Sequence, residues 1–137
     1  MSQRSTSEII DDFLGEGPWA VEGASTNREK YGNQVLRAYG QSGREAWPIN
    51  PRADEIEGLK CYPDLGSLPS VPRGISIITP PKITERVVEE AARLGVEFVW
   101  MQPGAESDRA LEIAAEHRIE AIGDGSCLLV VVGYREG

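Results

Sequence analysis

The stretch Trp19-Ala20-Val21-Glu22-Gly23-Ala24-Ser25, followed by Lys30-Tyr31-Gly32, decides the fold that this sequence predicts. Its apolar beginning predicts a short strand, and its small residues predict a turn that leads into a helix. Gly23 can adopt a positive φ and allows a ligand to approach the bare backbone. Amides beyond the turn and the positive end of the helix dipole suit phosphate oxygens. On this stretch alone, a phosphate-binding turn and a plain tight turn are equally favoured.

The length and charge of the chain restrict its class. Its 137 residues are enough for one domain with a proper core. The net charge of -8 argues against nucleic acid as a partner, because phosphate backbones require clustered cations. Residues 1–7 do not resemble a signal peptide, and the apolar run 128–132 is too short to span a membrane. Two cysteines without disulfide or zinc spacing complete the expectation of a cytoplasmic protein with no membrane partner and no bound metal.

Apolar runs alternate with helical patterns along the chain. The runs predict strands over residues 19–22, 45–49, 74–79, 97–101 and 120–123. Helices are predicted from Ser7 to Leu14, before Gly43, from a cap at Thr84 to Gly95, and from Ser107 onward. Residues 53–72 are predicted to be irregular, with a helical turn at 67–69. The run 128–132 predicts either a covering segment or an added edge strand.

This alternation implies right-handed βαβ crossovers and therefore an α/β fold. We expect a Rossmann-like three-layer domain with a mostly parallel sheet of five strands, or six if the last run adds one. Residues 1–18 are predicted to form an N-terminal helix and linker within the same domain as residues 19–137.

Ligands of open parallel sheets bind beyond the carboxyl ends of the strands, where the strand order reverses. Five loops are predicted at that edge, formed by residues 23–25, 50–52, 79–81, 102–104 and 124–127. They consist largely of glycine, proline, small polar residues and amides, and none places a general base beside a nucleophile. The sequence therefore predicts a binding surface without catalytic residues.

A nicotinamide cofactor site is the nearest enzyme alternative. Gly23 is followed by Ala24 and Ser25, so the G-x-G-x-x-G pattern is absent. The second strand ends at Asn50, where an NAD site would have an acidic residue for the ribose. A neutral amide beside Arg52 suits a phosphorylated ribose better, although Asn50-Pro51 is also typical of a simple turn.

The sequence resembles small single-domain CoA-binding proteins, which are related to the CoA-binding domain of the succinyl-CoA synthetase α subunit. The matching residues are Gly23-Ala24-Ser25, Lys30-Tyr31-Gly32, Ile49-Asn50-Pro51, Glu55-Ile56-Glu57-Gly58, Tyr62, Leu68-Pro69, Pro80-Pro81, Val99-Trp100-Met101-Gln102-Pro103-Gly104-Ala105 and Cys127. Their order and spacing extend over nearly the whole chain, from Trp19 to Leu129.

The resemblance implies a CoA site with the pyrophosphate on the Gly23 turn. It also implies that Asn50, Pro51 and the loop after Thr79 hold the nucleotide, while residues 102–104 and Cys127 lie toward the pantetheine. The predicted binding residues are Gly23, Ala24, Ser25, Lys30, Asn50, Pro51, Arg52, Thr79, Pro80, Pro81, Gln102, Pro103, Gly104 and Cys127. Among them, Lys30 and Arg52 are expected to contact phosphates.

Three residues depart from the family pattern or allow two interpretations. Glu22 stands where the family has an apolar residue, and its carboxylate would repel a pyrophosphate unless it turns away or is paired. His117 is the single histidine and is expected to be a solvated residue at a helix end, so ligase activity does not carry over. Cys127 is either a small buried hydrophobic residue or a thiol that forms a mixed disulfide with CoA.

The sequence thus predicts a binding protein for CoA or an acyl-CoA that is not itself an enzyme. An NAD(P)-dependent oxidoreductase and an interaction domain with a vestigial pocket are the alternatives, and a homodimer stays open. Gly23→Val is expected to abolish binding by steric exclusion. Gly23→Ala is expected to change little else in the chain and so to test the turn directly.

Overall fold

Five parallel strands form the central sheet of the structure, a computed structural model that describes residues 4–136. The strands are β1 (Trp19–Glu22), β2 (Ala46–Ile49), β5 (Gly74–Ile77), β6 (Phe98–Met101) and β7 (Glu120–Ile122). All pairings in this sheet are parallel. The predicted α/β fold with five strands is confirmed. The predicted segments 1–18 and 19–137 extend to residues 1–3 and 137, which lie outside the described part.

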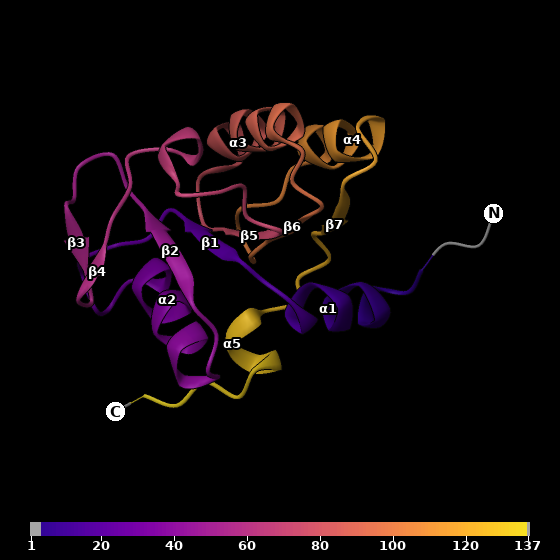
Figure 1. The fold of residues 1–137 in the computed structure, drawn as a ribbon. Coiled ribbons are helices and arrows are strands. Elements are labelled where there is room, and N and C mark those ends of the chain that lie inside the picture. Colours follow the sequence, from indigo (N-terminus) through magenta and orange to yellow (C-terminus); the bar gives the residue numbers. More distant parts are fainter. Residues whose placement is uncertain (1–3, 137) are drawn as a thin grey trace.

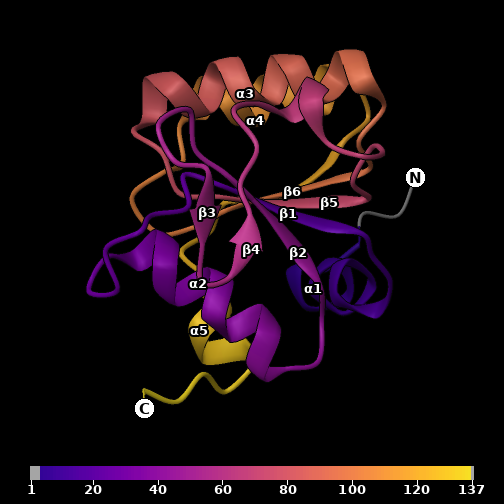
Figure 2. The ribbon, with the colours of Figure 1, turned by 60° about the vertical axis from the view of Figure 1, so that its left-hand side comes forward.

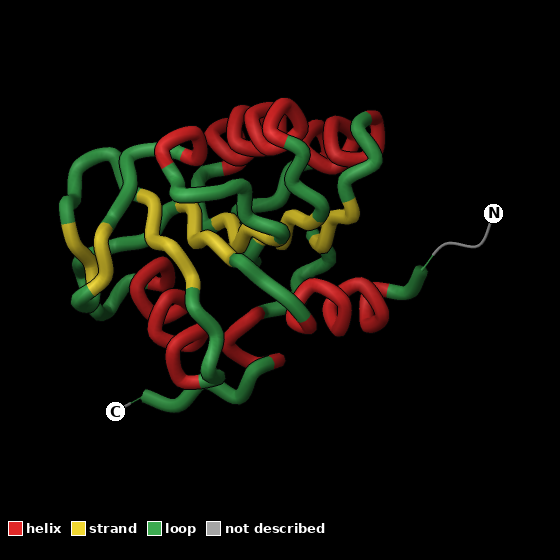
Figure 3. Tube along the Cα trace, in the orientation of Figure 1, coloured by secondary structure: helices red, strands yellow, loops and turns green. Residues whose placement is uncertain are grey.

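Helices cover both faces of the sheet, as Figure 1 and the tube in Figure 3 show. One face carries α3 (Pro81–Leu94) and α4 (Asp108–Glu116), and the other carries α1 (Thr6–Gly15), α2 (Tyr31–Gln41) and α5 (Leu128–Val131). Every residue of β5 and β6 is buried, which fits the continuous apolar runs that predicted these strands.

The strand order is β2-β1-β5-β6-β7, so the chain reverses its direction of travel between β1 and β5. The carboxyl ends of these two neighbouring strands are Glu22 and Ile77, which pair in register. Ligands of doubly wound sheets bind at such a reversal. The loops after β1 and β5 are therefore the ones that the topology assigns to a site.

A small hairpin, absent from the sequence-based prediction, lies beside β2, an edge strand of the sheet (Figure 2). It pairs β3 (Glu55–Ile56) with β4 (Leu59–Lys60) through a turn in which Glu57 has a φ of 51°. The strands have only two residues each, too few for a periodic pattern. The helical turn expected at 67–69 is a 3₁₀ turn at Leu65–Ser67.

Two predicted helix starts are wrong for physical reasons. Helix α1 is capped by Ser5, because its hydroxyl and the Glu8 carboxylate form a capping box two residues before the predicted cap. Helix α3 begins at Pro81, whose fixed φ suits a first helical position. Thr84 is buried inside that helix instead of capping it. The alternative of a sixth strand is wrong as well, since residues 128–131 form the covering helix α5.

Candidate functional site

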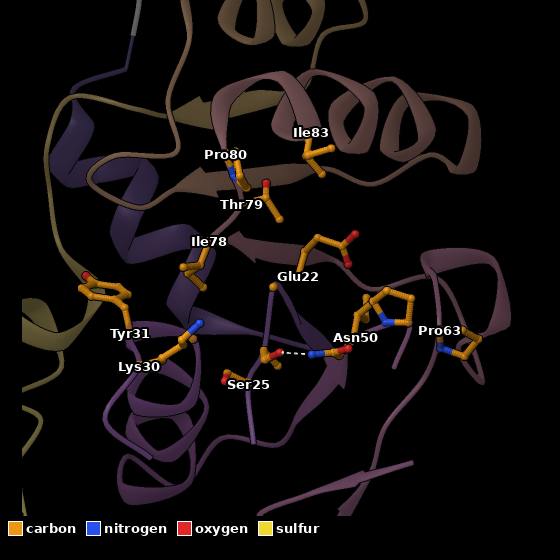
Figure 4. Close-up of a pocket in the computed structure, with 15 residues that line it drawn as sticks. Glu22, Ser25, Lys30, Tyr31, Asn50, Pro63, Ile78, Thr79, Pro80 and Ile83 are labelled. Atoms are coloured by element: carbon orange, nitrogen blue, oxygen red, sulfur yellow. Dashed lines mark hydrogen bonds between the residues drawn. The ribbon is translucent and has the colours of Figure 1, made fainter. Parts of the chain in front are cut away.

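A cavity of about 590 Å³ opens at the carboxyl ends of β1 and β5 (Figure 4). Its wall consists of the ends of these strands and of β2, the loops that follow them, and the starts of α2 and α3. The lining residues are Glu22, Gly23, Ala24, Ser25, Lys30, Tyr31, Gly32, Ile49, Asn50, Pro51, Pro63, Ile78, Thr79, Pro80 and Ile83. Eight of the predicted residues lie here: Gly23, Ala24, Ser25, Lys30, Asn50, Pro51, Thr79 and Pro80.

Gly23 is required by the packing of the strand ends. It has a φ of +93°, and a Cβ at this position would overlap the carbonyl oxygen of Ile78. Gly32 is held in the same way, because its Cβ would overlap the carbonyl oxygen of Gly23. The expectation that Gly23→Ala changes little else is therefore wrong: the methyl group would push apart the ends of β1 and β5.

The turn does not offer all of its amides to a ligand. The amides of Gly23 and Ala24 both donate to the carbonyl of Ile49, at 3.3 and 3.2 Å. The first amides of a helix have no partner within the helix, and α2 places those of Tyr31 and Gly32 at the cavity wall. Within residues 4–136, no hydrogen bond engages the amides of Ser25, Tyr31 or Gly32. These three amides are the donors that an anion in the cavity could use.

Two asparagines hold the turn in place. The Asn50 side chain donates to the carbonyl of Ala24 at 2.8 Å and accepts from the amide of Arg52 at 2.8 Å. Asn33 is fully buried and donates to the carbonyl of Ser25 at 2.8 Å. Asn50 thus shapes the site with a side chain that is already engaged. Asn33 was missed, although a polar residue among the apolar positions of α2 was a visible signal.

Two oppositely charged side chains line the cavity. Lys30 is the N-cap residue of α2, and its ammonium group points into the cavity (Figure 4). Glu22 ends β1, and burial together with the charges of Glu90 and Asp64 raises the pKa of its carboxyl to about 7. No salt bridge joins Glu22 to Lys30 in the described structure. Glu22 is therefore a carboxyl group that the protein itself leaves without a cation.

Tyr31 connects this cavity to the residues expected near the pantetheine. Its hydroxyl donates to Gln102 Oε1 at 3.1 Å and also contacts the Cys127 sulfur. Gln102 is fully buried, and the same Oε1 accepts from the amide of Leu128 at 2.9 Å. Burial and the contact with Cys127 raise the pKa of the Tyr31 hydroxyl. Gln102 and Cys127 thus stand behind Tyr31 and do not line the cavity.

The other predicted binding residues are also outside the cavity wall. Arg52, Pro81, Pro103 and Gly104 are exposed, and the amide of Gly104 is bound by the Glu106 carboxylate at 2.8 Å. His117 is exposed at the end of α4, and its Nδ1 lies 2.9 Å from the carbonyl of Ile113.

Metal and membrane features were sought in the described residues. They contain no cluster of three or more His, Cys, Asp or Glu side chains that could bind a metal ion. None of their helices combines the length and apolar character needed to cross a membrane.

The fold and the cavity together define a nucleotide-binding α/β domain with its site at the reversal of strand order. Residues 18–132 match the family model described as CoA binding domain, so the chain belongs to that family. The resemblance drawn from the sequence is confirmed.

Relatives and solved structures add detail. An ADP-forming acetate–CoA ligase II of Archaeoglobus fulgidus is 34% identical over 116 residues, which cover 76% of this chain and 17% of the ligase. The α subunit of an ADP-forming acetate–CoA ligase II of Pyrococcus furiosus is 27% identical over 126 residues, covering 84% of this chain and 28% of the subunit. A conserved hypothetical protein from Pyrococcus furiosus has a solved structure with a TM-score of 0.78 and 40% identity, covering 82% of this chain and 97% of that protein.

These relatives correct one prediction. We expected a protein that is not an enzyme, and the finding that these two curated relatives are acetate–CoA ligases contradicts this. The chain spans less than a third of the length of these two ligases, and the shared part is the CoA-binding domain.

Proposed function

We propose that this protein binds coenzyme A in the cavity between the ends of β1 and β5. The observation that carries the proposal is the opening of the first turn of α2 into this cavity, with Lys30 beside it. The amides of Ser25, Tyr31 and Gly32 and the Lys30 ammonium group form a set of donors for a pyrophosphate. The family match supports CoA as the nucleotide.

We propose an orientation for the ligand from the residues that line the cavity. The nucleotide lies toward the ends of β2 and β5, where Pro51, Pro63, Pro80 and Ile83 give flat apolar surfaces for a base. The pantetheine extends toward Tyr31, the cavity residue whose hydroxyl contacts Gln102 and Cys127. We expect the exposed side chain of Arg52, two residues after Asn50, to contact the 3′-phosphate of the ribose.

Calorimetric titration with CoA, acetyl-CoA, NAD and NADP tests this function. We expect CoA and acetyl-CoA to bind with one site per chain, and NAD and NADP to bind far more weakly. Binding of NADP without CoA would favour the oxidoreductase alternative. Binding of none of the four would leave an interaction domain with a vestigial pocket.

We further propose that the bound CoA serves an acyl-CoA ligase reaction. The identity to two acetate–CoA ligases supports this, and the remaining parts of such an enzyme would lie outside the shared domain. The test is to add this protein to a ligase from which the CoA-binding domain has been removed. Formation of a CoA thioester from acetate, CoA and ATP, with release of ADP and phosphate, only in the mixture supports the proposal. A mixture as inactive as its components contradicts it.

A further inference from the structure

Glu22 is a carboxyl group without a partner in the wall of the proposed CoA site. Its Oε2 is buried and has no hydrogen-bond partner within residues 4–136. Figure 4 shows the side chain extending from the end of β1 toward Ile83 of α3, along the cavity and not away from it. Glu22 therefore lines the cavity with a carboxyl group, one oxygen of which is buried without a partner.

The charged and titratable groups around Glu22 favour its neutral form. Glu90 from α3 and Asp64 from the segment before η1 both oppose its negative charge. Cys61, which follows β4, has a raised pKa, mainly because it is buried and to a smaller extent because of the Glu22 charge. Its thiol is therefore neutral. Lys30 at the start of α2 is the one cation in the cavity wall, and it forms no salt bridge with Glu22 in the described structure.

We propose that Glu22 contacts the bound nucleotide as a neutral carboxylic acid and donates a hydrogen bond to one of its acceptor atoms, so that the protein takes up a proton when it binds CoA. This inference rests on the proposed function. A pyrophosphate next to the Gly23 turn brings further negative charge to within a residue of Glu22, and like charges cannot both be tolerated at that distance. A protonated carboxyl removes the repulsion and carries an O–H that can donate to an acceptor atom of the nucleotide.

Proton uptake makes the affinity dependent on pH, with a sign that follows from linkage. The carboxyl of the free protein has a pKa of about 7, and an anion in the cavity raises this pKa further. Binding therefore weakens as the pH rises above 7. Affinity should fall about fivefold from pH 6 to pH 8, and uptake at pH 7 should be about half a proton per site.

Dephospho-CoA is the probe, because the 3′-phosphate of CoA itself titrates near pH 6. It is titrated calorimetrically into the whole protein at pH 6, 7 and 8, in buffers with different ionisation enthalpies. The dependence of the observed heat on the buffer gives the number of protons taken up. The pH dependence of the Glu22 carboxyl ¹³C shift, with and without dephospho-CoA, gives the same answer without a substitution.

Glu22→Gln keeps a donor and removes the titration. This variant should bind equally at pH 6 and pH 8, take up no proton, and bind about fivefold more tightly than the parent at pH 8. The matched control is Glu89→Gln on the exposed side of α3, which should keep the uptake of the parent.

The outcomes separate the two proposals. Tight binding of dephospho-CoA by the parent without proton uptake, or with an unshifted ¹³C titration, overturns the role of Glu22 and leaves the proposed function standing. No binding of CoA or dephospho-CoA at any pH overturns the proposed function, and the role of Glu22 with it.

Discussion

The five strands of the sheet end at one edge, but the two halves of this edge differ. The loops after β1, β2 and β5 surround the cavity, and we call them the open half. The loops after β6 and β7, the closed half, do not line the cavity. They are tied to the segment that leads into α5, because Trp100 donates to the carbonyl of Ser126 at 3.0 Å and Gln102 Oε1 accepts from the amide of the fully buried Leu128.

The difference shows where a parallel sheet can bind a ligand. The open half lies at the reversal of strand order, where the connections leave to opposite faces of the sheet, to α2 after β1 and to α3 after β5. In the closed half, a buried amide of Gln102 occupies the place where the sequence suggested a ligand contact. Tyr31 connects the two halves, since it lines the cavity and binds Gln102.

The largest effect on the free energy of unfolding is expected from a substitution of Gly32, in the open half. Gly32→Ala places a methyl group onto the carbonyl of Gly23, which should destabilise the protein by about 3 kcal/mol or more. Gly40→Ala in the same helix meets open space and should stabilise the protein by about 0.5–1 kcal/mol. Urea unfolding of both variants tests this. Equal free energies of unfolding for the two variants would contradict the close contact between α2 and the Gly23 turn.

The next effect is expected from opening the closed half at Gln102. Gln102→Ala leaves the amide of Leu128 without its acceptor and creates a void, which should destabilise the protein by about 2–3 kcal/mol. The variant should also loosen α5, measured as faster hydrogen exchange of the Leu128 amide. Exchange as slow as in the parent would show that α5 is held by other contacts.

Glu22 gives the stability of the open half a dependence on pH. Its pKa is about 7 in the folded state against 4.5 in a model peptide. Between these values only the folded protein keeps the proton, so the stability contributed by Glu22 is present below pH 4.5 and is lost as the pH rises to 7. Partial exposure limits the loss to about 2 kcal/mol.

The difference between the parent and Glu22→Gln isolates this contribution. The variant should match the parent near pH 4.5 and exceed its free energy of unfolding by about 2 kcal/mol at pH 8. Two stability profiles that run parallel over this range would show that Glu22 ionises as freely in the folded state as in the unfolded state.

The smallest effect is expected for CoA binding when Arg52, outside the cavity wall, is replaced. Arg52→Ala should weaken CoA binding by about 1–2 kcal/mol through loss of a charge-assisted hydrogen bond to the 3′-phosphate. Dephospho-CoA should be bound equally by the parent and the variant. An equal loss of affinity for CoA and dephospho-CoA would show that Arg52 does not contact the 3′-phosphate.

The sequence predicted the strands well, because runs buried on both faces leave a strong apolar signal. It also predicted most of the cavity wall, since that wall follows from where parallel strands end. It could not predict which amides are free, because the carbonyl of Ile49 takes those of Gly23 and Ala24 only once β1 and β2 are paired. The apolar run at residues 128–132 was ambiguous between a cover and a strand, because its three valines favour a strand. In the structure it forms the helix α5, whose first amide, that of Leu128, donates to Gln102 Oε1.

The central claim is that CoA occupies the open half of the edge, and amide chemical shifts measured during titration with CoA test it most directly. The account predicts the largest shifts at Ser25, Tyr31 and Gly32, with smaller ones at Ile83. The second large hollow, of about 560 Å³ beside Trp47 and Leu59, should stay unchanged. Shifts confined to Trp47 and Leu59, with those of Ser25 and Gly32 unmoved, would contradict the account.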